Sequence, residues 1–243
     1  MCGRYAAARD PADLAAAFRV DEVAAEGDLP PRYNIAPTDP VYAVLTRADG
    51  GSVPRRQLRV VRWGLVPSWA ADPKIGSRLI NARLETVGSK PAFRKAFAVR
   101  RCLIPADGYY EWYRVQGPGK PRKQPFFIRP KDGGILPMAG IYELWKDPSN
   151  GEWLWSCAVI TTRAEDELGY LHERMPTFVA PDNWERWLDP RLTDPDLAVE
   201  LLRPASPGWL EAHPVSTLVN DVRRDGPELI TSVEVPAGTV VST

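Results

Sequence analysis

A cysteine stands at the second position of the chain, in the sequence Met1-Cys2-Gly3-Arg4. If the initiator methionine is removed, Cys2 carries a free α-amine and a thiol on adjacent carbon atoms. The reference pKa values are ~7.7–8.0 for an α-amine and ~8.5 for a thiol, so both groups are partly deprotonated near neutral pH. Such a 1,2-aminothiol closes a five-membered thiazolidine ring on an aldehyde. The alternative is that Cys2 is an incidental residue of a frayed terminus.

Two other residues have the chemistry of proton carriers. Glu111 lies in an aromatic run, and strand alternation would place it on the same face as Tyr109 and Tyr113. If that face is inward, apolar neighbours raise the pKa of the carboxyl group and suit it to proton transfer; if it faces water, Glu111 is a solvated acid. His172 lies in a polar turn and is the better catalytic candidate of the two histidines, whereas His213 precedes a proline and is expected to serve a turn.

Two further segments carry groups that suit a nucleic acid. Asn81 can hydrogen-bond a sugar oxygen and Arg83 can bind a phosphate, although these residues also fit a helix start with Asn81 as the N-cap. Trp63 and Trp69 flank a turn that contains glycine and proline. A loop tryptophan near arginines can stack bases and bind phosphates, but a surface turn closed by tryptophan explains the same residues.

Composition sets wide limits on function. Lysine plus arginine and aspartate plus glutamate both total 31, so the net charge is zero and gives no general indication of nucleic-acid or membrane binding. We find no apolar run long enough to span a membrane and no signal peptide. Cys102 and Cys157 lie in apolar runs, and no cysteine or histidine spacing is typical of a metal site. These features favour a cytoplasmic protein without a cofactor.

The pattern of apolar and turn residues predicts one α+β domain. We expect an N-capped helix after Asp10 and short helices over 92–99, 183–187 and 196–202. We expect strands over 41–46, 58–63, 109–115, 126–129, 138–145 and 153–161. Helices do not alternate with strands at a βαβ rhythm, so the pattern predicts a strand-rich, mostly antiparallel core, partly closed into a barrel, with peripheral helices.

Several short motifs follow one another in a specific order. They are Met1-Cys2-Gly3-Arg4, the segment 32–38, Trp63-Gly64-Leu65-Val66-Pro67, the segment 81–86, the segment 101–112, Gln124-Pro125-Phe126-Phe127, the segment 172–176 and His213-Pro214-Val215-Ser216. This order resembles the SRAP family (SOS response-associated peptidase), known as abasic-site processing proteins. The resemblance covers residues 2–235, with Met1 removed, and leaves 236–243 as a C-terminal tail.

The resemblance implies a single SRAP domain with a positively charged DNA groove. It implies a DNA-damage response protein, a monomer that binds single-stranded DNA, prefers single-strand/double-strand junctions and crosslinks covalently to abasic sites, with lyase-like activity and removal of its own Met1. The implied catalytic residues are Cys2, Asn81, Glu111 and His172, and the implied DNA-binding residues are Arg4, Asn34, Trp69, Arg83, Thr161 and Arg174. One departure is Ala70, where some relatives carry a second aromatic residue, so the preference for DNA ends is open.

Under this resemblance, His172 assists opening of the abasic sugar, Glu111 transfers protons and positions the amine, and Asn81 holds the sugar or the new ring. The order of amine and thiol attack stays open. Two other classes also remain. An N-terminal-nucleophile hydrolase or peptidase would use the Cys2 thiol on an amide, and a non-enzymatic single-strand-binding module would use only the tryptophans and arginines.

Overall fold

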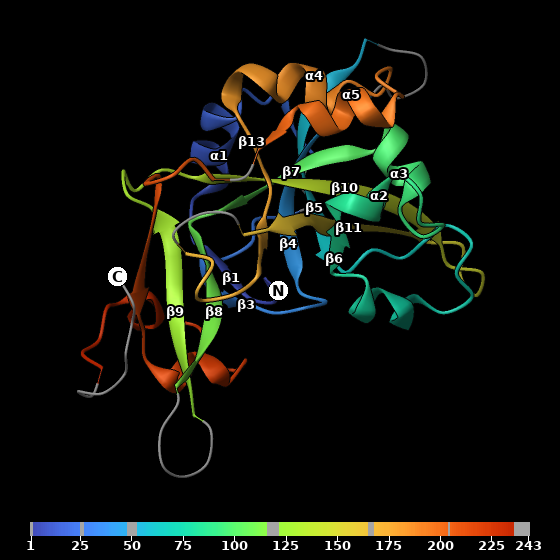
Figure 1. The fold of residues 1–243 in the computed structure, drawn as a ribbon. Helices are drawn as coiled ribbons and strands as arrows, with labels where there is room; N and C mark the ends of the chain where they lie inside the picture. Colours follow the sequence, from blue (N-terminus) through green and yellow to red (C-terminus); the bar gives the residue numbers. More distant parts are fainter. Residues whose placement is uncertain are drawn as a thin grey trace.

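The computed structural model describes residues 2–24, 27–47, 53–115, 122–164, 168–203 and 205–235. Its centre is a closed five-stranded barrel (Figure 1). The barrel strands are β4 (Pro40–Arg47), β5 (Arg55–Trp63), β7 (Arg101–Ala106), β10 (Leu136–Lys146) and β11 (Trp153–Arg163). They follow the order β11-β5-β4-β7-β10, and a further pairing of β10 with β11 closes the ring. All neighbours are antiparallel except β5 and β11.

Alternation along the barrel strands separates two apolar clusters. On β4, Val41, Ala43 and Leu45 belong to one cluster, while Tyr42 and Val44 belong to the other. The second cluster also holds helix residues, so it lies on the outer face of the barrel, where helices cover it. The first cluster fills the inside of the barrel and includes Cys2.

A second, five-stranded sheet has the order β15-β9-β8-β1-β3. Its strands are β1 (Tyr5–Ala7), β3 (Arg32–Ile35), β8 (Gly108–Val115), β9 (Arg122–Pro130) and β15 (Leu210–Pro214). Gly108 allows the close approach of β8 to β9, because a Cβ atom there would lie 2.4 Å from Cζ of Phe127 and 2.6 Å from the carbonyl oxygen of Ile128. This sheet brings the start of the chain beside Glu111.

Short helices surround the barrel. They are α1 (Pro11–Ala17), α2 (Leu84–Val87), α3 (Arg94–Val99), α4 (Trp184–Leu188) and α5 (Pro195–Glu200), with 3₁₀ turns at Pro73–Arg78, Pro181–Asn183, Thr217–Asn220 and Pro227–Ile230. Asp10 caps α1 by accepting a 2.8 Å hydrogen bond from the backbone of Ala12, as the sequence predicts. Figure 1 shows α4 and α5 across one end of the barrel, with α2 and α3 at its side.

Five minor strands extend the sheet that forms the barrel: β2 (Glu22–Val23), β6 (Asn81–Arg83), β12 (Arg174–Pro176), β13 (Phe178–Val179) and β14 (Leu202–Arg203). Both β6 and β12 pair with β11, so the segments that carry Asn81 and Arg174 each lie beside β11.

The predicted fold class is confirmed: a single, strand-rich α+β domain with a barrel core and peripheral helices. Each predicted strand lies within or overlaps an observed strand. The proposed tail at 236–243 and Met1 lie outside the described residues. Within the described part of the chain, the helices are too short or too polar to cross a membrane.

Candidate active site at the amino terminus

Cys2 lies three residues before the start of β1 at Tyr5, and its position follows from the pairing of β1 with β8. Tyr5 is opposite Tyr109 in this antiparallel pair, and the carbonyl of Arg4 accepts a 3.0 Å hydrogen bond from the backbone of Tyr110. Extending the same register places Gly3 opposite Glu111. Cys2 is fully buried, so the alternative of an incidental residue on a frayed terminus does not fit the structure.

Three charged or polar groups act on the Cys2 thiol besides its apolar surroundings. Burial raises the pKa of this thiol and the Glu111 carboxylate raises it further, whereas the positive charge of the amino terminus and a hydrogen bond from the backbone of Arg4 lower it. At neutral pH the group is therefore a thiol rather than a thiolate.

Asn81 holds the backbone of Cys2. Its side-chain nitrogen donates a 2.7 Å hydrogen bond to the Cys2 carbonyl oxygen. Asn81 is in β6, opposite Val159 of β11, while α2 begins at Leu84 with Arg83 at its N-cap position. The alternative of Asn81 as a helix N-cap is therefore wrong. The Asn81 Oδ1 atom is buried and has no hydrogen-bond partner among the described residues, so it can accept a bond from a ligand.

Glu111 faces the protein interior. Its carboxyl group is buried, which raises its pKa from 4.5 to about 7. Sequence alone left both orientations open, and the inward one is observed because the opposite face of β8 packs Tyr110 against Phe127 in a separate apolar cluster. A carboxyl group with this pKa gains and loses protons near neutral pH.

His172 faces the same small cavity as Glu111. The cavity measures about 10 Å³, room for about one water molecule, and is lined also by Tyr109, Leu171 and Arg174. The His172 Nδ1 atom accepts a 2.9 Å hydrogen bond from the backbone of Arg174, so the neutral ring carries its proton on Nε2. Burial lowers the pKa of His172, which favours this neutral form.

Arg4 and Asn34 form one hydrogen-bonded unit. Arg4 donates a 2.6 Å bond to Asn34 Oδ1 and a 2.9 Å bond to the carbonyl of Val219, and its guanidinium lies 5.8 Å from the centre of the Trp112 ring. Asn34 is fully buried, and its amide also donates to the carbonyls of Val219, Asp221 and Arg224. Asn34 therefore positions Arg4 and the 3₁₀ turn rather than facing an open groove.

Arg174 is also held inside the protein. Its guanidinium makes two hydrogen bonds with Glu85, at 2.6 and 3.0 Å, and a 2.6 Å bond to the carbonyl of the fully buried Thr161. Glu85, which the sequence did not single out, is the ion-pair partner of Arg174, 89 residues away in the chain. Thr161 and Glu85 thus fix Arg174, whose backbone in turn orients His172.

Two predicted DNA-binding side chains are exposed. Arg83 makes no hydrogen bond or ion pair with any residue that the structure describes, and Trp69 is 62% exposed. Ala70, by contrast, is buried against Val66 and Trp145, and its carbonyl accepts a 2.7 Å bond from the Trp145 indole. A second aromatic residue at position 70 would not fit this packing, so Trp69 alone projects from the loop.

Tyr5 is a site neighbour that the sequence did not single out. It packs edge-to-face on Trp63 with ring centres 5.0 Å apart, and its buried hydroxyl lacks a hydrogen-bond partner within the described ranges.

His213 serves structure, as predicted: its Nε2 lies 2.8 Å from the Ile230 carbonyl. The described part of the chain holds no cluster of three or more residues that could bind a metal ion.

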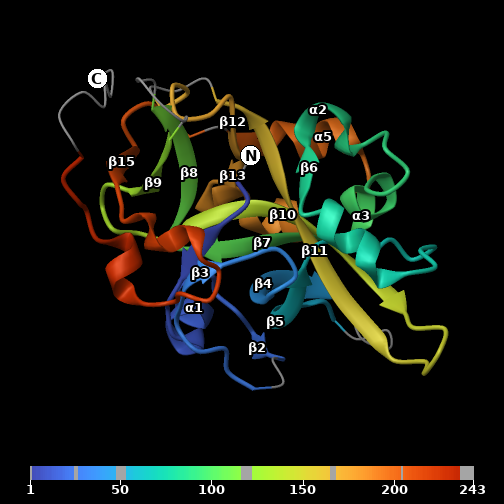
Figure 2. The same ribbon diagram turned by 90° about the horizontal axis from the view of Figure 1, so that it is seen from below.

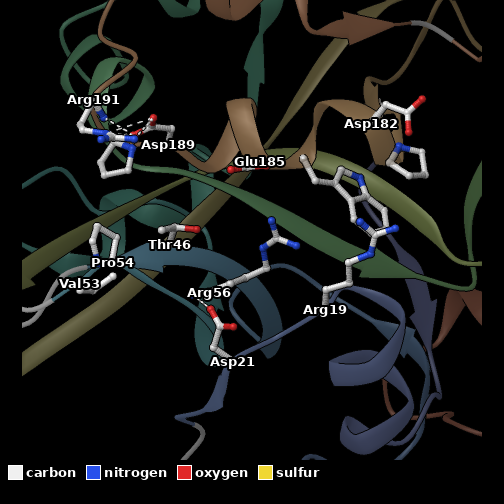
Figure 3. Close-up of a pocket in the computed structure, with 13 residues that line it drawn as sticks. Arg19, Asp21, Thr46, Val53, Pro54, Arg56, Asp182, Glu185, Asp189 and Arg191 are labelled. Atoms are coloured by element: carbon white, nitrogen blue, oxygen red, sulfur yellow. Dashed lines mark hydrogen bonds and ion pairs between the residues drawn. The ribbon is translucent and has the colours of Figure 1, made fainter.

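A wide pocket of about 770 Å³ lies elsewhere, between α4 and the segment around Arg56 (Figure 3). It contains three arginines and four carboxylates, and none of the predicted site residues lines it. We therefore place the candidate site at Cys2, Asn81, Glu111 and His172, where the observed contacts converge.

Comparison with known proteins identifies the family of the chain. Residues 1–222 match the family model described as SOS response associated peptidase (SRAP). The chain belongs to the SRAP family. Among curated SRAP relatives, "Abasic site processing protein YoqW" of Bacillus subtilis (strain 168) is 40% identical over 232 residues, 96% of this chain and 100% of that protein. "Abasic site processing protein HMCES" of Gallus gallus is 34% identical over 269 residues, 96% of this chain and 78% of that protein.

Solved structures support the same SRAP fold. A crystal structure of a protein from Bacteroides thetaiotaomicron has a TM-score of 0.80 at 26% identity and covers 96% of this chain and 100% of its own. A protein from Bordetella bronchiseptica has a TM-score of 0.72 at 24% identity, covering 88% of this chain and 100% of its own, which supports the fold alone.

Proposed function

We propose that this SRAP protein captures abasic sites in single-stranded DNA by forming a thiazolidine between Cys2 and the sugar aldehyde. The observation that carries the proposal is the convergence on Cys2: Asn81 binds its carbonyl, and Glu111 lies close enough to perturb its thiol. The names of the relatives add that proteins of this sequence class process abasic sites. The proposal requires removal of Met1, because the α-amine of Cys2 must be free.

The protonation states favour attack by the amine before the thiol. Burial keeps the Cys2 thiol protonated, whereas a free α-amine has a reference pKa of ~7.7–8.0. Glu111, with a pKa of about 7, removes a proton from the ammonium group and makes the amine nucleophilic. The amine adds to the C1′ aldehyde and water leaves, giving an imine.

The second step closes the ring. The thiol sulfur adds to the imine carbon, and the thiol proton moves to nitrogen, so one water is lost overall. His172 carries its proton on Nε2 and is the candidate donor for opening the closed sugar. The unpartnered oxygen of Asn81 accepts a hydrogen bond from the new ring nitrogen or the sugar. Ring closure removes the cationic imine that would otherwise promote strand cleavage.

DNA contacts come from exposed groups beside the site. Arg83 follows Asn81 by two residues on β6 and is free to pair with a phosphate, and Trp69 projects far enough to stack on a base or a duplex end. Binding therefore rests on backbone and stacking contacts and needs no base sequence. A peptidase that attacks amides with a thiolate is disfavoured, because burial opposes ionisation of Cys2.

The proposal is tested with single-stranded DNA that carries one abasic site, resolved on a denaturing gel. The wild-type protein gives a heat-stable shifted band that intact DNA does not give. Cys2→Ala and Cys2→Ser both abolish the untrapped band, and because both variants keep the α-amine, each gives a product only after borohydride trapping of the imine. Persistence of the untrapped band in Cys2→Ala, or no band with wild-type protein lacking Met1, contradicts the proposal.

A further inference from the structure

A groove of about 760 Å³ lies beside the β10–β11 hairpin, away from Cys2. We name it the Trp155 groove; the lining residues used below are Arg47, Lys95, Arg100, Tyr142, Trp153 and Trp155. Figures 1 and 2 both show the hairpin reaching outward beyond the barrel, with α3 on the same side of the molecule. Its shape and chemistry are unrelated to those of the cavity at Glu111 and His172.

The groove presents one exposed aromatic side chain, Trp153, beside a packed aromatic pair. Trp155 is stacked on the buried Tyr142, with ring centres 5.7 Å apart and planes 15° from parallel, and the guanidinium groups of Arg47 and Arg59 lie 4.9 and 4.5 Å from the centre of its ring. Trp153, on the same strand as Trp155, is 59% exposed, and the Lys146 ammonium lies 5.8 Å from the centre of its ring. Exposed tryptophan next to cations is the combination that stacks nucleic-acid bases without regard to sequence.

The groove is also positively charged, although the chain as a whole is neutral. Its lining includes three cations, Arg47, Lys95 and Arg100, against one carboxylate, Glu143. Glu143 is buried and paired with Arg100 at 2.7 Å, and the Arg47 guanidinium lies 4.9 Å from the centre of the Trp155 ring, so Lys95 is the exposed cation of the groove. The pocket in Figure 3, with its four carboxylates, has no such excess of positive charge.

The Trp155 groove adjoins the loop that carries Trp69. Ser68 lines the groove, and the Trp145 indole of β10 bonds to the carbonyl of Ala70, which fixes the loop against the hairpin. The exposed Trp69 and the groove therefore lie next to each other in the chain and in the fold. The positive charge and the exposed aromatic ring both suit a polyanion with unstacked bases, rather than a neutral or positively charged ligand.

We propose that the Trp155 groove is a second binding subsite for single-stranded nucleic acid, taking the part of the strand that extends past Trp69. Bases stack on Trp153, and Lys95 neutralises a phosphate. The proposal takes DNA as ligand from the proposed function but involves none of its chemistry, so intact strands are bound as well as abasic ones.

The test measures equilibrium binding of intact oligo-dT by fluorescence anisotropy, with a short strand of about 5 nucleotides and a long strand of about 16, lengths at the two ends of typical single-strand site sizes. Trp153→Ala combined with Lys95→Ala weakens binding of the long strand by roughly tenfold and lowers its salt dependence, because one stacking contact and one phosphate contact are lost. Binding of the short strand stays as in the wild type.

Two matched variants act as controls. The single variant Trp153→Phe, in which Lys95 is unchanged, retains an aromatic ring and keeps most of the long-strand affinity. Arg129→Ala removes an exposed cation from β9, on the opposite side of the molecule from the hairpin in Figures 1 and 2, and leaves affinity unchanged. Unchanged long-strand affinity in the double variant overturns the proposal and leaves a protein partner as the occupant to consider; an equal loss for both strands overturns it too.

The outcome is separable from that of the crosslinking proposal. Crosslinking of a short abasic strand by the double variant proceeds at the wild-type rate, since neither Trp153 nor Lys95 lies at Cys2. If the wild type fails to crosslink but the double variant still loses affinity for long intact strands, the subsite stands and the crosslinking proposal fails. If the wild type crosslinks abasic strands but the double variant binds long intact strands as tightly as the wild type, the subsite proposal fails and the crosslinking proposal stands.

Discussion

Replacing Glu111 by glutamine should change the pH dependence of stability in a defined direction. Burial raises the pKa of the Glu111 carboxyl group from 4.5 to about 7, so the folded protein binds an extra proton between these two values. Stability from this group is fully present below pH 4.5 and is lost as the pH rises through about 7. One pKa unit corresponds to about 1.4 kcal/mol, so the interval between 4.5 and about 7 amounts to roughly 3 kcal/mol.

The assay is urea unfolding followed by tryptophan fluorescence at about pH 4.5 and about pH 8. Glu111→Gln has no carboxyl group to ionise, so the free energy of unfolding of the variant relative to wild type should rise by up to roughly 3 kcal/mol between the two conditions. Glu200→Gln, which alters an exposed carboxylate on α5, should follow the wild type. The same difference between Glu111→Gln and wild type at both pH values would refute the assignment of a buried, proton-binding Glu111.

Three further substitutions test neighbouring parts of the account. Arg83→Ala should weaken binding of intact single-stranded DNA and reduce the slope of log affinity against log salt by about 1, and an unchanged slope would argue against a phosphate contact. Asn81→Ala removes the 2.7 Å bond to the Cys2 carbonyl and should slow single-turnover crosslinking by roughly tenfold, about the effect of one hydrogen bond; a wild-type rate would remove Asn81 from the site. Gly108→Ala places a Cβ atom 2.4 Å from Phe127 and should lower the free energy of unfolding by about 1–3 kcal/mol in denaturant titrations, whereas wild-type stability would mean that β9 moves freely.

Four of the five barrel strands were predictable from sequence, including β4 and β10, which are buried on both faces but are rich in strand-forming residues. The run 153–161 was identified as a strand, and β11 covers it. In contrast, β7 is buried at all six positions and includes Pro105, so it shows neither alternation nor a strand-like composition. Closure of the barrel also depends on a parallel pairing of β11 with β5, which joins segments far apart in the sequence that no local pattern relates.

The candidate site was accessible from sequence only through the order of its motifs. Local patterns left the orientation of Glu111 undecided, because β8 has apolar residues on both faces. Asn81 fitted a helix start equally well until its pairing with β11 was known. Long-range hydrogen bonds decide the roles of Asn34 and Glu85, which hold Arg4 and Arg174 from elements far away in the chain. Tertiary contacts of this kind cannot be predicted from the spacing of residues in the sequence.

The most direct test of the central claim is the intact mass of the protein–DNA product formed on an abasic strand. The proposed chemistry predicts the mass of the chain without Met1 plus that of the oligonucleotide less one water, with no added hydrogen after borohydride treatment, because the thiazolidine is already saturated. Peptide mapping should place the adduct on Cys2. A product that retains Met1, one that maps to a lysine, or one that gains hydrogen on reduction would contradict the claim.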